Sequence, residues 1–344
     1  MQPEATMKAV YLMEPEKTEQ REIPVPRPGP LDVLVKMNAV GVCGSDVHYY
    51  EHGRIGNCRV EEPLILGHEC AGVVVETGDQ VSSLQEGDRV ALEPGIPCRR
   101  CRHCLSGRYN LCPNVVFMAT PPVDGAFCEY VTSPEDFAYR LPEGVSMEAG
   151  ATIEPLAVGM HACNLTGLRP GESVVVLGAG PIGLLAVAAA AAYGATSITA
   201  VDLLPNRLEV APLLGATETV NAAETDVTEE LSGTADVVLE CAGVPQTAAQ
   251  AFDIARRGGR VAWIGMGGDR VEVPLGKAQG KEVSVHPVFR YAGVYRAAVN
   301  LMAAGRIDTN ALVTHRFEFP RVQEALEFCA HNRESSLKTM VIFG

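Results

Sequence analysis

The chain lacks an excess of basic residues. Its 344 residues include 28 Lys and Arg against 42 Asp and Glu, which gives a formal net charge of −14 at pH 7. Nucleic acids and anionic membrane surfaces both require a basic surface on the protein that binds them. The charge balance therefore argues against both kinds of partner.

The sequence also lacks a signal-peptide pattern, internal repeats and low-complexity segments. The first residues, MQPEATMKAVYLMEPEK, contain no apolar run of signal-peptide length. Eleven cysteines without a secretion signal are typical of a reducing compartment, where clustered thiols bind metal more often than they form disulfides. We therefore expect a cytoplasmic protein.

No stretch of the chain is expected to cross a membrane. The most apolar segment, residues 174–201, is long enough to do so. However, Gly and Pro occur inside it at turn spacing, and they divide it into a strand, a turn, an Ala-rich helix and a second strand. This pattern is that of a soluble α/β protein.

Two different patterns of composition and predicted secondary structure indicate two domains. Up to about residue 155 the chain is rich in Gly and Pro, with short β-branched runs between turn signals, which indicates an irregular, mostly antiparallel β domain. From residue 173 strand patterns alternate with helical patterns such as 247–259, which indicates right-handed βαβ units and a parallel sheet. After about residue 290 the chain returns to the first pattern. We therefore expect one domain at 1–155 and 291–344 and a second at 156–290.

The segment GAGPIG, residues 178–183, is a candidate dinucleotide site. It follows a predicted strand and opens a predicted helix, as the Gly-rich fingerprint requires. Gly178 would allow the tight turn, Gly180 would let the backbone approach a pyrophosphate, and Gly183 would let the helix pack on the strand. The free N–H groups at the helix N-terminus would then bind the anion.

An acidic residue after the next strand predicts which dinucleotide binds. Asp202 ends the run SITAVD about twenty residues downstream, where a carboxylate can accept both ribose hydroxyls and would repel a 2′-phosphate. The prediction is NAD(H) over NADP(H). Arg207 follows five residues later; it could contact a phosphate, stack on adenine or pair with an acid.

Four cysteines in the stretch CRRCRHCLSGRYNLC, residues 98–112, predict a metal site. Four thiolates form a closed tetrahedral shell, which favours Zn²⁺ and leaves no position for a substrate, so the expected role is structural. An iron–sulfur cluster, free thiols and a zinc-finger-like contact to nucleic acid are the alternatives, and the net charge opposes the last. The four ligands are Cys98, Cys101, Cys104 and Cys112.

A second candidate metal set is dispersed along the first domain. Cys43 lies in GVCGSDVHYY, His68 and Glu69 lie in ILGHECAG, and Glu154 lies in TIEPLAVGMHA. Each alone has an ordinary explanation as a core or turn residue. Together, one thiolate, one imidazole and one carboxylate would leave a position open for water or an alcohol, as a catalytic zinc requires.

The chain resembles the zinc-dependent medium-chain dehydrogenases, and within them it is similar to the polyol branch of sorbitol and xylitol dehydrogenases. The resemblance covers essentially the whole chain. The segments that point to the polyol branch are HYYEHGRIG, ATPP and VFRY, whereas the Cys and GHE features alone are shared across the superfamily. Its distinctive stretches are 41–56, 64–72, 98–112, 117–131, 153–163, 178–183 and 288–291.

The resemblance implies an α/β protein with a GroES-like catalytic domain and a Rossmann doubly wound domain. It also implies two Zn²⁺ per chain, NAD, and a homo-oligomer, either a dimer or a tetramer. Cys43, His68 and Glu69 would bind the catalytic zinc with water as the fourth ligand, and Glu154 would hold that water or coordinate in its place. Ser45 and His48 would form the proton path. The implied polyol pocket is Tyr49, Phe117, Glu154, Arg290 and Tyr291. The implied cofactor residues are Gly178, Gly180, Ile182, Gly183, Asp202, Arg207, Ile264, Gly265, Met266, Val288, Phe289 and Arg290.

The implied activity is oxidation of a sugar alcohol to a ketose by hydride transfer to NAD. A pocket rich in polar side chains favours a polyol, because an apolar alcohol would leave each of them unpaired at a cost of about 1–3 kcal/mol. Galactitol, L-arabinitol, threonine and a simple secondary alcohol are the alternative substrates. A non-catalytic binder of zinc and nucleotide would not need an open metal set.

Overall fold

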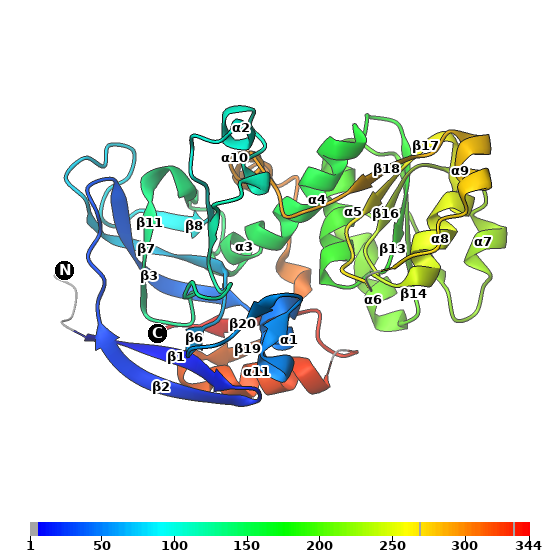
Figure 1. Ribbon diagram of the computed structural model, residues 1–344. Coiled ribbons are helices and arrows are strands. Elements are labelled where there is room, and N and C mark those ends of the chain that lie inside the picture. Colours follow the sequence, from blue (N-terminus) through cyan, green and yellow to red (C-terminus); the bar gives the residue numbers. More distant parts are fainter. Residues whose placement is uncertain (1–5, 268–269, 333) are drawn as a thin grey trace. The chain divides into compact units, whose positions relative to one another are not determined.

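The computed structural model describes residues 6–267, 270–332 and 334–344, and this part of the chain forms two compact units (Figure 1). The first unit takes the described residues of 1–154, 295–303 and 313–344, and the second takes 155–294 and 304–312. The chain thus leaves the first unit, builds most of the second and returns.

The first unit is built on a seven-stranded sheet in which β3 is central. The sheet has the order β12-β8-β7-β3-β20-β19, with β11 also pairing with β3. All pairs are antiparallel except β19 with β20. The strands are β3 (Asp32–Gly41), β7 (Glu69–Thr77), β8 (Arg89–Leu92), β11 (Tyr130–Pro134), β12 (Ala138–Arg140), β19 (Val313–Glu318) and β20 (Lys338–Ile342).

A smaller sheet and several short elements complete the first unit. The small sheet has the order β2-β1-β6, and its apolar side chains join one core cluster with those of β3 and β7. Its strands are β1 (Thr6–Glu14), β2 (Lys17–Pro24) and β6 (Leu64–Ile65), and the short strand pairs are β4 (Arg54–Ile55) with β5 (Cys58–Arg59) and β9 (Gly95–Ile96) with β10 (Val116–Phe117). The helices are α1 (Gly44–His52), α2 (Arg102–Leu105), α3 (Met147–Ala151), α10 (Tyr295–Ala303) and α11 (Val322–His331).

The register of three strands brings distant residues to one end of the large sheet. Gly41, the last residue of β3, pairs with Glu69 at the start of β7 on one side. On its other side Gly41 pairs with Met340 of β20. The chain segments around residues 42, 68 and 338 therefore meet although they are up to 296 residues apart.

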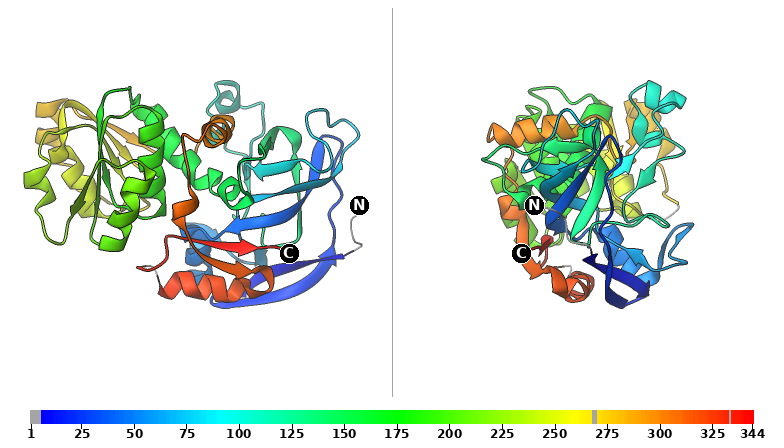
Figure 2. Two further views of the ribbon diagram at one scale, coloured as in Figure 1. Left: turned by 180° about the vertical axis from the view of Figure 1, so that it is seen from behind. Right: turned by 90° about the vertical axis from the view of Figure 1, so that its left-hand side faces the viewer.

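The second unit is a six-stranded parallel sheet with the order β15-β14-β13-β16-β17-β18 (Figure 2). The order reverses at β13, as in a doubly wound dinucleotide fold, so the predicted fold class is confirmed. The strands are β13 (Ser173–Leu177), β14 (Ser197–Asp202), β15 (Glu218–Asn221), β16 (Ala235–Glu240), β17 (Ala255–Trp263) and β18 (Ser284–Pro287). The helices are α5 (Pro181–Ala192), α6 (Pro205–Val210), α7 (Val227–Glu230), α8 (Pro245–Ile254) and α9 (Leu275–Lys281), and α4 (Ile153–Thr166) begins at the end of the first unit.

One helix ends earlier in the structure than the sequence pattern predicts. The apolar period predicts a helix over 247–259, but α8 ends at Ile254 and β17 begins at Ala255, which pairs with Ala235 of β16. Gly258, with a φ of 69°, adopts a left-handed conformation that a helix does not accept. In the described residues, none of the helices has the length and apolarity needed to cross a membrane.

A buried carboxylate attaches the four-cysteine loop to the sheet. Glu93 follows β8 with an exposed fraction of 1%, and it accepts hydrogen bonds from the hydroxyls of Tyr109, at 2.6 Å, and Tyr139, at 2.9 Å. Tyr109 belongs to the cysteine loop. The loop is also tied by Arg99, 2.7 Å from Asp136. Burial raises the pKa of Glu93 to about 7, although the two phenol hydrogen bonds oppose this shift.

We predict that Glu93 makes the stability of the protein fall as pH rises through 7. A carboxyl whose folded-state pKa lies above its ordinary value binds its proton more tightly in the folded state. Its stabilising contribution is complete below about pH 4.5, decreases as pH rises from there, and is lost once pH has passed the folded-state pKa of about 7. Each unit by which the folded state raises the pKa corresponds to about 1.4 kcal/mol of stability. The melting temperature of Glu93→Gln should therefore fall less than that of the native protein between pH 5 and 8. Glu143→Gln, at an exposed loop position, is the control; equal slopes for all three proteins would contradict the prediction.

Candidate active site

Three of the predicted metal ligands converge in the first unit. The Sγ of Cys43, a ring nitrogen of His68 and a carboxylate oxygen of Glu69 all lie within 4.8 Å of one another. Cys43 is the residue before α1, and His68 and Glu69 enter β7. Gly41 is required here, because a Cβ at that position would overlap the Glu69 carboxylate. The set contains one sulfur, one nitrogen and one oxygen donor, which fits a catalytic zinc.

A buried aspartate that the sequence reasoning missed orients two of these ligands. Asp46, in the first turn of α1, is fully buried and accepts the backbone N–H groups of Cys43 and Gly67, each at 2.9 Å. One of its oxygens lies 3.6 Å from Nδ1 of His68. A carboxylate behind a histidine ligand fixes the ring and leaves its other nitrogen for the metal. The spacing from Cys43 to Asp46, a helix N-cap pattern, is the signal that could have identified it.

A buried lysine, also missed, holds the third ligand. Nζ of Lys338 lies 2.8 Å from both carboxylate oxygens of Glu69 and 3.2 Å from the carbonyl oxygen of Val42. The exposed fraction of Lys338 is 3% and that of Glu69 is 0%. The sequence feature that could have identified Lys338 is its place as a single basic residue in the apolar strand segment LKTMVIF. Lys338 thus fixes the carboxylate that faces Cys43 and His68.

The electrostatics of this centre favour a bound cation. Burial lowers the pKa of His68, but the charges of Asp46 and Cys43 outweigh it and raise that pKa well above its ordinary value. The pKa of Lys338 is likewise raised, because Glu69 and Cys43 outweigh the effect of burial. Both bases are thus driven toward their charged forms by the acids around them. The same surplus of negative charge would stabilise a divalent metal.

The four cysteines of the loop also converge, as a separate group. The Sγ atoms of Cys98, Cys101, Cys104 and Cys112 lie within 4.8 Å of one another. The Sγ atom of Cys104 lies 3.4 Å from that of Cys101 and 4.0 Å from that of Cys98. Both distances are close to the edge of about 3.8 Å that a tetrahedron with Zn–S bonds of about 2.3 Å requires. Backbone N–H groups of residues 100 and 101 lower the pKa of Cys98 to about 6, so it readily supplies a thiolate. The loop fits a closed zinc site.

Several residues predicted for the proton path and the substrate belong to the first unit. Ser45 is half-buried and His48 is exposed, and both lie on α1, which begins directly after Cys43. The ring of Phe117 lies 5.7 Å from that of His68. Glu154 is buried, and its charge raises the pKa of Lys338. Tyr49 is buried on α1.

The predicted dinucleotide residues occupy the turn between β13 and α5. Gly178 has a φ of 92°, and a Cβ there would lie 2.8 Å from the backbone nitrogen of Ala242. A Cβ at Gly183 would collide with the carbonyl oxygen of Gly178, whereas a Cβ at Gly180, the N-cap of α5, would meet only the Nη1 atom of Arg207, at 3.9 Å. The turn therefore has the close packing and the open approach that the fingerprint requires.

Asp202 and Arg207 lie together beside this turn. The carboxylate of Asp202 accepts the backbone N–H of Ala179 at 2.7 Å and that of Leu204 at 3.0 Å. The guanidinium of Arg207 lies 3.4 Å from the same carboxylate, so of the alternatives for this residue the structure shows pairing with an acid. Asp202 is thus held at the carboxyl end of β14, next to the Gly-rich turn.

The other predicted residues of the second unit follow β17 and β18. Ile264 and Gly265 donate their backbone N–H groups to the carbonyl oxygen of Glu240, and Met266 is exposed. Val288 donates its N–H to the carbonyl oxygen of Trp263. The guanidinium of Arg290 lies 5.0 Å from the centre of the Phe289 ring, and Tyr291 is buried.

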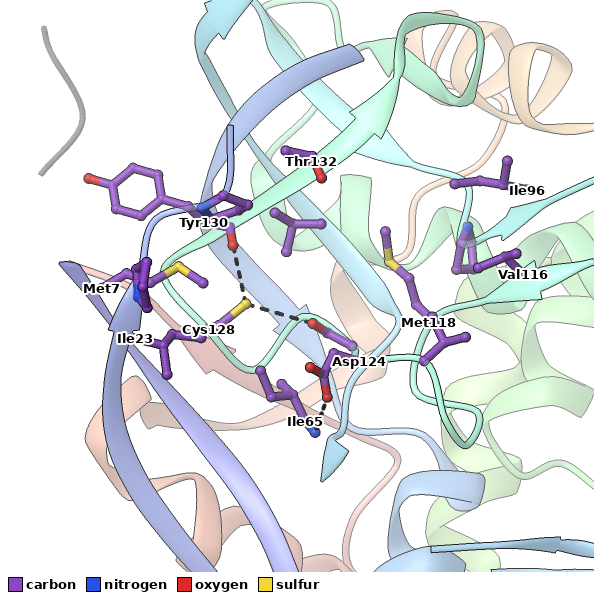
Figure 3. A pocket seen from close by; sticks show the side chains of 16 residues that line it. Met7, Ile23, Ile65, Ile96, Val116, Met118, Asp124, Cys128, Tyr130 and Thr132 are labelled. Carbon is purple, nitrogen blue, oxygen red and sulfur yellow. Dashed lines mark hydrogen bonds between the residues drawn. The ribbon is translucent and has the colours of Figure 1, made fainter. Parts of the chain in front are cut away.

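A pocket of about 390 Å³ lies on the first unit (Figure 3). Its walls are mainly apolar, and Asp124 supplies a carboxylate whose pKa is raised by burial. Val116 and Met118 line it, while Phe117 between them contacts the ring of His68. None of the predicted site residues is among the described side chains that line it. This pocket is therefore distinct from the metal centre.

Two family models match the chain. They describe an alcohol dehydrogenase GroES-like domain, at residues 29–143, and a zinc-binding dehydrogenase, at residues 181–304. A sorbitol dehydrogenase of Bacillus subtilis is 44% identical over 342 residues, which cover 97% of both chains. The chain belongs to the zinc-dependent alcohol dehydrogenase family. The resemblance to the polyol branch is confirmed, and so is membership of a family of oxidoreductases that use zinc and a nicotinamide cofactor.

Further relatives agree with this placement. A probable D-xylulose reductase A of Aspergillus clavatus is 44% identical and covers 90% of this chain and 89% of its own. Among solved structures, an Escherichia coli oxidoreductase of unknown specificity superposes with a TM-score of 0.94 at 38% identity, covering 98% of this chain and 99% of its own. A zinc-binding dehydrogenase of Sinorhizobium meliloti, solved with NADP, has a TM-score of 0.91 at 34% identity, covering 98% and 100%.

We predict that Lys338→Met makes stability strongly dependent on zinc. Removing one partner of a buried ion pair costs about 3–5 kcal/mol, because the other charge stays buried without compensation. In the variant only a bound cation can compensate Glu69, so chelation should lower its melting temperature by several degrees more than that of the native protein. The test is thermal unfolding before and after dialysis against a chelator.

Lys17→Met is the matched control for this experiment. Lys17 also lies 2.8 Å from a carboxylate, that of Glu14, but both side chains are more than 60% exposed. An exposed pair contributes about 0–1 kcal/mol, so the control should respond to chelation as the native protein does. Equal losses in all three proteins would show that Lys338 has no role in compensating Glu69.

Proposed function

We propose that this protein is a zinc- and NAD-dependent polyol dehydrogenase that oxidises a sugar alcohol of the sorbitol or xylitol type to the ketose. The observation that carries the proposal is the convergence of Cys43, His68 and Glu69. Three protein ligands of this kind leave one coordination position for a substrate, whereas four thiolates leave none. The activity is therefore assigned to this set, and the cysteine loop is assigned a structural zinc.

The residues around the centre have distinct tasks in this proposal. Zinc bound there would supply Lewis-acid polarisation of a hydroxyl oxygen. Ser45 would accept the hydroxyl proton and pass it to His48, whose exposed ring releases it to water. Lys338 and Asp46 keep the Glu69 carboxylate and the His68 ring in place while charge develops. The substrate carbon would transfer its hydride to the nicotinamide.

The polyol preference rests on the polar side chains proposed for the pocket and on the relatives. Glu154, Tyr49, Arg290 and Tyr291 can bond the hydroxyls that a simple alcohol lacks. The curated relatives at 44% identity are named sorbitol dehydrogenases and D-xylulose reductases. Both names describe interconversion of a polyol and a ketose, the reaction proposed here.

We also propose NAD as the preferred cofactor, a homo-oligomeric state, a cytoplasmic location and two zinc ions per chain. Asp202 supports NAD because its carboxylate stands at the carboxyl end of β14, where a 2′-phosphate would be repelled. NADP is the alternative cofactor, because the similar dehydrogenase of Sinorhizobium meliloti was solved with NADP bound. The catalytic domain is proposed at 1–155 and 291–344, and the cofactor domain at 156–290.

The proposal is tested by the rate of NADH formation with a panel of substrates. Sorbitol, xylitol, galactitol, L-arabinitol and ribitol should exceed L-threonine and 2-butanol in kcat/KM by at least about 100-fold, equivalent to about 2.7 kcal/mol of transition-state binding. The highest kcat/KM with galactitol, L-arabinitol, threonine or the simple alcohol would replace the sorbitol or xylitol assignment by that alternative. Failure of every substrate, with zinc and NAD bound, would favour a non-catalytic protein.

We predict opposite consequences for cysteines of the two metal sets. Cys43→Ala should lower the zinc content by one ion per chain and abolish turnover, while NAD still binds, because the open ligand set is incomplete. Cys101→Ala should lower the melting temperature far more than turnover per folded molecule. Metal analysis, NADH formation and thermal unfolding of both variants measure this. Normal turnover in Cys43→Ala would rule out the catalytic assignment, and the reverse pattern would make the loop catalytic.

We predict that Asp202→Ala weakens discrimination between the two dinucleotides. Without the carboxylate, Arg207 loses its acidic partner and the 2′-phosphate meets no repulsion. The ratio of kcat/KM for NAD to that for NADP should fall by at least about tenfold, or about 1.4 kcal/mol. Asp253→Ala, an acid at the end of α8, is the control. An unchanged ratio in Asp202→Ala would show that another group selects the cofactor.

A further inference from the structure

Two histidines lie on one exposed face of α1. His48 and His52 are one helical turn apart, and both are exposed. Glu51 lies on the same face, three residues after His48. The run HYYEH therefore has the order His-x-x-Glu-His, a spacing that places two imidazoles and a carboxylate together on a helix and binds divalent metal in other proteins.

The two rings already touch. Their centroids are 4.6 Å apart and their planes are perpendicular. In this arrangement the edge of one ring faces the other, so a metal shared by both requires one ring to turn about its terminal torsion. That torsion is broad in histidine, and neither ring is enclosed. The described donors do not form a complete three-ligand set here, so water would fill the remaining positions.

The backbone beneath the pair is fixed. The opposite face of α1 is buried through Asp46, Val47, Tyr49 and Tyr50. The hydroxyl of Tyr50 donates to the carbonyl oxygen of Glu16 at 3.0 Å. The spacing of the two histidines is thus set by a packed helix, so a metal need not order the backbone when it binds.

We propose that His48 and His52 form an accessory site for a divalent transition-metal ion such as Zn²⁺, and that its occupation slows the enzyme. Imidazole is a good ligand for zinc, copper and nickel, and the Glu51 carboxylate adds opposite charge on the same face. The site has fewer protein ligands than the two metal centres described above, so its ion exchanges with solvent. The inhibitory effect rests on the proposed function, because a metal on His48 would occupy the imidazole that releases the proton.

The test uses zinc-loaded enzyme from which loosely bound metal has been removed by gel filtration. Calorimetric titration with Zn²⁺ should show one further ion per chain, and the same zinc concentrations should slow polyol oxidation. In His52→Gln the dissociation constant and the half-inhibitory concentration should both rise at least tenfold, each compared with that variant's own rate without added zinc. His331→Gln, an exposed histidine at the end of α11, is the matched control and should behave as the native enzyme.

Each outcome decides a separate part of the proposal. Unchanged zinc binding in His52→Gln would overturn the site. Zinc binding that depends on His52 but does not slow the enzyme would overturn the inhibitory part and would count against His48 in the proton path. Neither result alters the rate with polyols in the absence of added zinc, so a failure here is distinct from a failure of the polyol assignment.

Discussion

The buried pairing of Glu69 with Lys338 is the interaction on which the site depends. It joins β7 to β20 across the end of β3. Both charged groups, the carboxylate of Glu69 and the ammonium of Lys338, are buried away from water. A buried ion pair alone is a weak source of stability, since desolvation offsets the attraction. Its value here is positional, because it fixes the carboxylate of Glu69, a predicted ligand, next to Cys43 and His68. The C-terminal strand thereby becomes part of the centre.

The two metal sets differ in how they are completed. The cysteine loop closes on itself within fifteen residues; it is attached to Glu93, next to β8, through Tyr109, and to Asp136, between β11 and β12, through Arg99. The open set instead takes its ligands from the residue before α1 and from the start of β7, and its supporting groups from α1 and β20. A closed set needs only local chain geometry. An open set needs neighbouring elements of the fold to hold its ligands in place, so that one coordination position of the metal can stay free for a substrate.

The sequence predicted the architecture and the residues that converge in the two candidate metal sites, but not the groups that support them. The strand pattern before the GAGPIG turn and the dispersed Cys43, His68 and Glu69 were informative because their residue types carry the chemistry. Lys338 was missed because a partner defined by strand register cannot be seen in local spacing. Asp46 was missed because its cap spacing from Cys43 does not reveal its further contacts, to Gly67 and His68. The helix expected at 247–259 was too long, because pairing of Ala255 with β16 overrides its helical period.

The central claim is that the alcohol meets the metal held by Cys43, His68 and Glu69, and this can be tested directly by cobalt substitution. Co²⁺ bound by one thiolate, one imidazole and one carboxylate differs in its visible spectrum from Co²⁺ bound by four thiolates. The account predicts that xylitol with NAD shifts the bands of the one-thiolate cobalt and leaves the four-thiolate bands unchanged. A shift confined to the four-thiolate bands would contradict it.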